Sequence, residues 1–170
     1  MDKNYYLNRL TDLYSYYHDV KTVPNLAPFP LDIYAHFYQS NQKYFGSRNV
    51  SLWRVNNEEH CFVKYYEKVD NLIFDEMIMT LKKAVVKLVT PNPDHMKTAI
   101  TGVAITEKPP GAELVSHAKK FSYKKPYMFY LHGWSEIRFL LIDLSSKQVI
   151  CNSAGKEVKK FYEGLFSDGR

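Results

Sequence analysis

Stretches with strand patterning come in groups in this sequence, and amphipathic helical stretches separate the groups. Apolar and polar side chains alternate over 31–39, as in a strand with one covered face. A turn is expected at 41–49, around Gly46. Residues 50–55 and 60–67 follow, rich in aromatic and β-branched residues, with Asn56-Asn57 between them as a hairpin turn. Consecutive strands flanked by helices predict an α+β fold with a largely antiparallel sheet. The second group consists of three further stretches: 127–132, 136–144 and 148–151.

Helical periodicity marks the stretches around these groups. Residues 4–19 carry apolar side chains on one stripe, at i, i+4, i+7 and i+11. A longer helix is predicted from its N-cap residue, Asp70, to about Val89, where two prolines follow. Two shorter helices are expected at 113–121 and after Asn152 or Ser153.

One further strand, at 98–106, stands between two helices, and its small or β-branched residues are typical of a strand covered on both faces. The predicted order is therefore α-βββ-α-β-α-βββ-α, which suggests a duplicated α-βββ-α unit, although no residue-level identity links the halves. A chain of 170 residues, 45% of them apolar and 24% charged, is expected to form one domain, 1–170. The proline-rich stretch 23–30 is an extended connector in it.

Composition limits the environment that we expect for the protein. No stretch resembles a secretory signal or a membrane-spanning helix, so the sequence predicts a soluble, cytoplasmic protein that makes no membrane contact. Cys61 and Cys151 are expected to be reduced, buried thiols. The net charge of +5 comes from 18 lysines against five arginines, which indicates solubility more than nucleic-acid recognition.

Several stretches of the sequence are distinctive. They read LDIYA at 31–35, NQKYF at 41–45 and GWSEIR at 133–138, the last continuing through 142–144 to NSAGKEV at 152–158. Together they resemble a small uncharacterised protein family of Gram-positive anaerobic bacteria, over most of the chain. This resemblance implies no activity, no cofactor and no residue role.

Glu136 and Arg138 are the strongest candidates for chemistry. They lie two residues apart on a predicted strand, so their side chains share one face, which continues as an apolar face. Nucleases of the restriction-endonuclease type, which have an α-βββ-α core, use an acidic-x-Lys pair on a strand to hold a divalent metal. This sequence departs from that pattern, because the preceding strand, 127–132, contains no second acidic ligand. Arginine also cannot replace the lysine as a proton acceptor. A divergent metal-dependent hydrolase would centre on Glu136, with Asp143 and His132. The alternative is a structural ion pair.

A second candidate is the polar, aromatic face of the strand at 31–39. Tyr34, His36 and Tyr38 share this face, and Trp134 is a further aromatic candidate for ligand binding. Such a face either binds a ligand or lies under another segment of the protein. No two of the six histidines stand at i, i+4, and two cysteines are too few for a zinc site, so the sequence predicts neither a metal nor a cofactor.

Lysines cluster around 82–87, 119–125 and 156–160. The candidates for nucleic-acid contacts are Lys119, Lys120, Lys124 and Lys125, with aromatic residues nearby. The alternative is three solvated helix faces. Because the sequence shows no nucleotide-binding or nucleophile motif, it favours a non-catalytic binding or interaction module. Its partner would be a protein, including a second copy in a homodimer, or a small molecule; nucleic-acid binding and a metal-dependent hydrolase are the alternatives.

Overall fold

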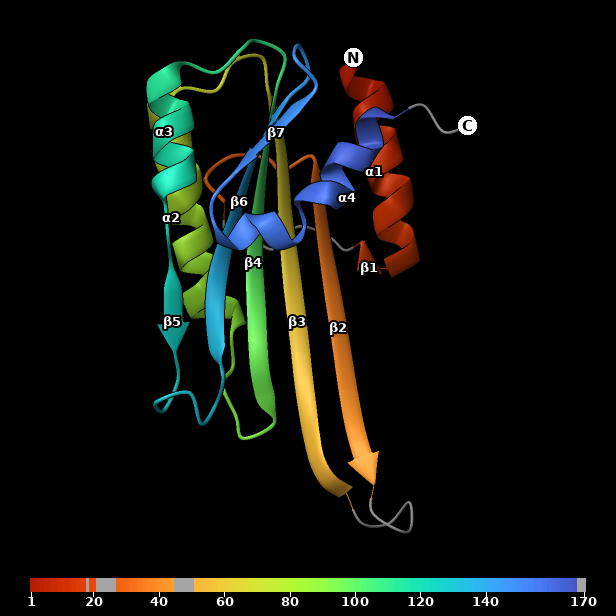
Figure 1. Cartoon of the computed structure of the whole chain (residues 1–170), viewed down its shortest axis with the longest axis vertical. Coiled ribbons are helices and arrows are strands. Elements are labelled where there is room, and N and C mark those ends of the chain that lie inside the picture. The colour runs from red at the N-terminus through yellow and green to blue at the C-terminus, as the bar shows by residue number, and fades with distance from the viewer. Residues whose placement is uncertain (18, 21–26, 45–50, 168–170) are drawn as a thin grey trace.

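A computed structural model describes residues 1–17, 19–20, 27–44 and 51–167 of the chain. Seven strands of this part form one sheet in the order β1-β2-β3-β4-β6-β5, with β7 also paired to β6 (Figure 1). The strands are β1 (Asp19–Val20), β2 (Ile33–Tyr44), β3 (Ser51–Tyr66), β4 (His95–Thr106), β5 (Lys124–Pro126), β6 (Trp134–Asp143) and β7 (Gln148–Cys151).

Helices cover both faces of the sheet. On one face lie α2 (Asn71–Leu88) and α3 (Ala112–Lys120), packed on a core that includes Tyr34, Phe62 and Ile100 of the strands. On the other lie α1 (Lys3–Tyr17), α4 (Lys159–Glu163) and the 3-10 helices η1 (Ala154–Glu157) and η2 (Gly164–Phe166). We call these the α2 face and the α4 face (Figure 1). Among the described residues, none of the helices combines the length and apolar character needed to cross a bilayer.

The sheet contains both strand directions, and most of its pairs are antiparallel. The pairs β1–β2, β2–β3, β5–β6 and β6–β7 are antiparallel, whereas β3–β4 and β4–β6 are parallel. The parallel pairs follow from the connections, because α2 returns the chain between β3 and β4, and α3 helps to return it between β4 and β6. The predicted α+β class, with helices flanking a largely antiparallel sheet, is confirmed.

Several local predictions are also confirmed. All residues of β4 from Thr98 to Thr106 are buried, as expected of a strand covered on both faces. Asp70 caps α2, its carboxylate accepting a hydrogen bond from the Ile73 N–H at 2.9 Å. Cys61 and Cys151 are both buried, and no disulfide bond joins them. Helix α1 buries Tyr6 and Leu10, the first two positions of the predicted stripe, but Tyr14 continues the stripe in place of Leu13. The helix also ends at Tyr17 and not at residue 19, because Asp19 and Val20 pair with β2.

The predicted hairpin at Asn56-Asn57 is wrong, because β3 runs without interruption from Ser51 to Tyr66. Both asparagines pair on both sides: Asn56 with Ser40 of β2 and Asn57 with Gln39, and both also with β4. In isolation these two asparagines would favour a turn, but pairing with the strands on both sides holds them in an extended conformation. The turn predicted at 41–49 is partly replaced by β2, which continues through Tyr44; residues 45–50 lie outside the described residues.

Residues 127–132 do not form the predicted strand but a tight loop between β5 and β6. Pro126 of β5 pairs with Trp134 of β6, so the chain has to reverse in the residues between them. This requirement overrides the strand preference of the aromatic residues. The backbone is left-handed at three successive positions, Met128, Phe129 and Tyr130, with φ of 48°, 52° and 71°.

The order of the described elements matches α-βββ-α-β-α-βββ-α, although different residues form some of the strands. The two halves pair differently, however. In the first, β1 and β3 flank β2, whereas in the second β5 and β7 both pair with the edge of β6 that β4 leaves open. The suggested duplication thus gains no support from topology. Of the predicted connector 23–30, residues 23–26 lie outside the described residues.

Candidate functional site

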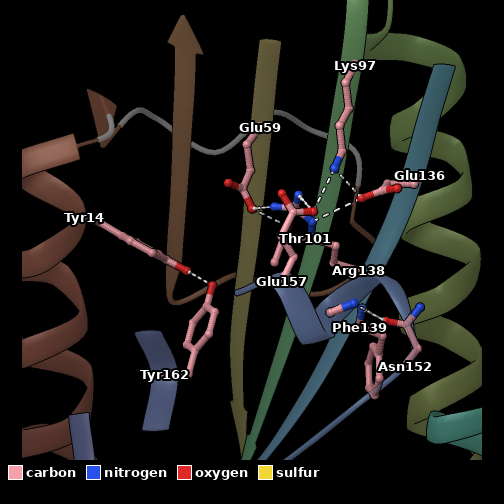
Figure 2. Close-up of polar contacts among 11 residues, drawn as sticks. Tyr14, Glu59, Lys97, Thr101, Glu136, Arg138, Phe139, Asn152, Glu157 and Tyr162 are labelled. Atoms are coloured by element: carbon pink, nitrogen blue, oxygen red, sulfur yellow. Dashed lines mark hydrogen bonds and ion pairs between the residues drawn. The ribbon is translucent and has the colours of Figure 1, made fainter. Parts of the chain in front are cut away.

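A cluster of charged side chains lies on the α4 face, where η1 meets β3, β4 and β6 (Figure 2). Its centre is Arg138 of β6, whose side chain is only 6% exposed. The guanidinium donates from Nη1 to Glu59 Oε1 at 3.1 Å and from Nη2 to Glu157 Oε2 at 2.7 Å. Its Nε lies 3.4 Å from Oε1 of Glu136. One buried cation thus contacts three carboxylates from β3, η1 and β6.

Lys97 of β4 completes this charged cluster. Its Nζ lies 2.9 Å from Glu136 Oε1 and 2.8 Å from Glu157 Oε2. The Thr101 hydroxyl donates to Glu59 Oε1 at 2.6 Å. Alternate residues of three adjacent strands supply these groups because the strand register brings their side chains onto one face. The charged cluster holds three carboxylates against two cations.

Electrostatics keeps Arg138 and Glu157 of the charged cluster ionised at neutral pH. Burial lowers the pKa of Arg138, but the carboxylates of Glu59, Glu157 and Glu136 raise it more, so that the pKa lies above its usual value. The pKa of Glu157 is lowered, above all by its hydrogen bond from Lys97 and also by the charge of Arg138. A ligand that binds next to the charged cluster therefore interacts with side chains that are already ionised and held in position.

Two hollows adjoin the charged cluster and share Glu59, Glu157 and Val158 in their linings. The first, which we call the aromatic hollow, has a volume of about 370 Å³, and its lining is completed by Tyr14, Cys61, Phe161 and Tyr162. The second has about 350 Å³ and is lined by polar and charged residues that include Lys97 and Arg138. An apolar compartment thus lies next to a charged one.

The groups at the back of the aromatic hollow are poor proton donors and nucleophiles. The hydroxyls of Tyr14 and Tyr162 are hydrogen-bonded at 2.6 Å in the protein interior (Figure 2). Burial raises the pKa of both hydroxyls well above the usual value. Burial likewise raises the pKa of the Cys61 thiol, so the thiolate that nucleophilic attack requires is scarce at neutral pH.

The structure brings together two of the four residues proposed for hydrolysis. Glu136 and Arg138 share one face, as predicted, and belong to the charged cluster. Asp143 lies at the other end of β6, about 23 Å along the strand from Glu136. It accepts hydrogen bonds from the hydroxyls of Ser145 and Ser146 in the turn before β7. His132 lies in the loop before β6, and its backbone oxygen is 2.7 Å from Nδ1 of His95.

We expect Asp143→Asn to lower the free energy of unfolding at pH 7 by about 1–3 kcal/mol, because the turn loses charge-assisted hydrogen bonds. Burial raises the pKa of Asp143, but hydrogen bonds from Ser145 and Ser146 lower it more, so it lies below its usual value. The carboxylate therefore stabilises the fold above the unfolded-state pKa, and this contribution is lost as pH falls through the folded-state pKa.

Urea unfolding of both proteins at pH 7 and pH 3 measures this effect of Asp143. The parent is expected to lose more stability than the variant as pH falls below about 4, where an unfolded aspartate titrates. An equal loss in the two proteins would contradict the assigned role.

The residues predicted to form one aromatic surface are divided between different surroundings. Tyr34 is buried in the core of the α2 face, so it is not an exposed binding residue, whereas Tyr38 is exposed. His36 lies beside Glu58 of β3. Trp134 stands at the start of β6, with the ammonium of Lys124 4.6 Å from its ring centroid.

The four lysines predicted to contact nucleic acid do not act as one group. Lys119 and lysines of the cluster at 156–160 line a hollow of about 450 Å³ beside β7, which we call the basic hollow. Lys124 lies over the rings of Tyr130 and Trp134, and Lys125 lies over the Tyr127 ring. Lys120 is exposed on α3. The lysines that line the basic hollow are Lys119, Lys156 and Lys159.

Sequence reasoning missed Glu59, Lys97 and Glu157 as parts of the site. Glu59 and Arg138 are 79 residues apart, so no local spacing connects them. The available signal was Arg138 itself, because an arginine on an otherwise apolar strand face requires carboxylate partners. The identity of those partners depends on the strand order.

Comparison with known proteins gives a family without an activity. A family model described as "Domain of unknown function (DUF8052)" matches residues 2–164. No curated protein and no solved structure matches the chain.

Proposed function

We propose that this chain, which belongs to the family of domains of unknown function DUF8052, is a non-catalytic binding module for a small molecule. The ligand has an apolar body and a cationic group, and it occupies the aromatic hollow. Membership confirms the expectation of an uncharacterised family. Its restriction to Gram-positive anaerobic bacteria, a cytoplasmic location and a homodimer stay predictions.

The observation that carries this proposal is the lining of the aromatic hollow. Three aromatic side chains and two carboxylates, Glu59 and Glu157, surround a space of about 370 Å³, the lower end of the range for ligand sites. Aromatic faces and carboxylates both attract cations. The charged cluster beneath holds one more carboxylate than cations, which favours a positively charged ligand.

The energetics of the charged cluster also support a binding role. Taking each ion out of water costs several kcal/mol, and apolar residues of similar volume often stabilise a fold at least as well as a buried ion network. Arg138 and its partners are therefore costly as a purely structural device. A preorganised set of charges beside a hollow is instead what specific recognition of a charged group requires.

Three probes of similar shape and different charge test this function: 2-phenylethylamine, 2-phenylethanol and 3-phenylpropionate. The amine is expected to raise the Tm of the full chain, and a concentration 100-fold above its Kd stabilises by about 2.7 kcal/mol. The neutral and anionic probes are expected to have little effect, because the neutral probe offers the two carboxylates no positive charge and the anionic probe is repelled by them. Calorimetric titration gives the affinity.

Two variants locate the site of amine binding. Glu59→Gln removes a lining carboxylate and is expected to weaken amine binding at least tenfold. Glu163→Gln changes a glutamate of α4 that does not line the aromatic hollow and is expected to leave binding unchanged. Equal binding of all three probes, or no binding of the amine, would rule this function out.

The basic hollow supports a second candidate function, binding of a phosphate-bearing partner such as a nucleic acid. Lysines from two separate clusters, Lys119 on the one hand and Lys156 and Lys159 on the other, line it. The alternative of nucleic-acid binding, stated from the sequence, required separate lysine clusters to converge in this way. We rank this function second because its lining lacks aromatic side chains for base stacking.

A further inference from the structure

Three side chains converge on the α2 face, opposite the charged cluster. His36 of β2 pairs in register with His60 of β3, and Glu58 precedes His60 by two residues, so all three side chains share one face. Oε1 of Glu58 lies 2.6 Å from Nε2 of His36 and 3.2 Å from Nε2 of His60. The three potential ligand atoms lie within 4.8 Å of one another.

His60 is the most enclosed of the three. Its side chain is 6% exposed, and its buried Nε2 has no hydrogen-bond partner. The other ring nitrogen, Nδ1, lies 2.7 Å from the hydroxyl of Tyr34. A hydrogen bond at one imidazole nitrogen fixes the ring so that the other nitrogen faces a metal, an arrangement that recurs around metal-binding histidines. The Nε2 of His60 thus faces Glu58 Oε1 at 3.2 Å without a well-aligned hydrogen bond.

We propose that His36, Glu58 and His60 bind a divalent first-row transition metal ion. Two imidazole nitrogens and one carboxylate oxygen are typical ligands of Zn²⁺ and its neighbours in the series, whereas Mg²⁺ and Ca²⁺ prefer oxygen alone. This site is independent of the proposed amine-binding hollow, since it uses the opposite face of the sheet.

The geometry needs little adjustment to accept the ion. Ligand atoms roughly 2.1 Å from a tetrahedral zinc ion lie ~3.4 Å apart. The 3.2 Å separation of His60 and Glu58 already approaches this value. The closer pair, His36 and Glu58, has to open by roughly 0.8 Å, which side-chain rotation supplies. The His36 and Glu58 side chains are 17% and 24% exposed, so an ion and a coordinating water can enter from solvent.

The state of Glu58 agrees with a ligand role. Burial raises its pKa, but the two adjacent imidazoles lower it more, so that the pKa lies below its usual value. The carboxylate is therefore ionised at neutral pH, as a metal ligand must be. The titration below tests whether this carboxylate and the two imidazoles bind an ion.

Titration of the chelator-stripped full chain with Zn²⁺ at pH 7.5 tests the site, by calorimetry and native mass spectrometry. We expect one ion per chain at a micromolar or lower Kd. His36→Ala and Glu58→Gln are each expected to weaken binding at least tenfold, and Tyr34→Phe by about 10- to 100-fold through the lost support of His60. His117→Ala removes an exposed histidine of α3 and is expected to leave the affinity unchanged.

Circular dichroism shows that each variant is folded, and Glu58→Gln keeps the size of the side chain if an alanine variant unfolds. The site is overturned if the parent binds no Zn²⁺ at 100-fold above the expected Kd. It is equally overturned if His36→Ala and Glu58→Gln bind as the parent does, which would leave a His–Glu–His group that shares protons. Loss of amine binding has no bearing on either result.

Discussion

Arg138→Met is expected to lower the free energy of unfolding by about 3–5 kcal/mol, the usual cost of removing one partner of a buried ion pair. The methionine keeps most of the volume of the arginine side chain, so the loss reports on charge. Glu59, Glu136 and Glu157 are then left with Lys97 as the remaining cation of the charged cluster. Urea unfolding, with a fall in Tm of roughly 10 °C, measures the effect.

Two further variants control this experiment. Lys159→Met breaks an exposed i,i+4 ion pair with Glu163 and is expected to change stability little. Glu59→Gln in the Arg138→Met background is expected to recover part of the loss, because one unpaired carboxylate is removed. A parent-like stability of Arg138→Met would show that the carboxylates do not depend on this guanidinium.

Asn152→Ala is expected to destabilise the protein by about 3–5 kcal/mol, since three hydrogen bonds are lost in the interior. The Oδ1 of Asn152 accepts from the N–H groups of Phe139 at 3.0 Å and Gly155 at 2.9 Å. Its Nδ2 donates to the carbonyl of Ile137 at 2.9 Å. The side chain thus extends the β6–β7 ladder beyond the last residue of β7 and anchors η1, which carries Glu157 (Figure 2).

The matched variants for Asn152 differ in which bonds they retain. Asn152→Asp keeps the two acceptor contacts but places an oxygen against the Ile137 carbonyl, so we expect an intermediate loss. Asn8→Ala replaces an exposed asparagine of α1 and is expected to cost nothing, because alanine favours a helix more. Equal stabilities of Asn152→Ala and Asn8→Ala in chemical denaturation would contradict the role given to Asn152.

Local patterns of the sequence predicted two of the five charged residues of the cluster. Glu136 and Arg138 share a strand face because side chains alternate along any strand, and this inference needed no tertiary information. The remaining members depend on which strands become neighbours. Glu59 reaches Arg138, and Lys97 reaches Glu136, only because β3, β4 and β6 pair in parallel, in one register.

The histidine site shows the same limit more strongly. Spacing along the chain gave no metal motif, since His36 and His60 come from different strands. The antiparallel register of β2 and β3 places the two directly opposite each other. A shift of one residue would turn one of them to the other face of the sheet and remove the site.

Two of the wrong predictions concern segments whose local preference is weak compared with their surroundings. Asn56 and Asn57 favour a turn in isolation, but hydrogen bonds to strands on both sides outweigh that preference. Residues 127–132 favour a strand by composition, but the pairing of β5 with β6 requires the chain to reverse there.

The sequence alone determined the positions of α1, α2 and α3, the doubly covered strand at 98–106, the cap at Asp70 and the α+β class, whereas the single helix expected after Asn152 or Ser153 is divided into η1, α4 and η2. These features follow from hydrophobic periodicity and local hydrogen bonding, which act over a few residues. Only the tertiary structure decided the strand order, the hollows, the charged cluster around Arg138 and the convergence of His36, Glu58 and His60. Such features depend on the pairing of strands far apart in the chain, and no local spacing encodes that pairing.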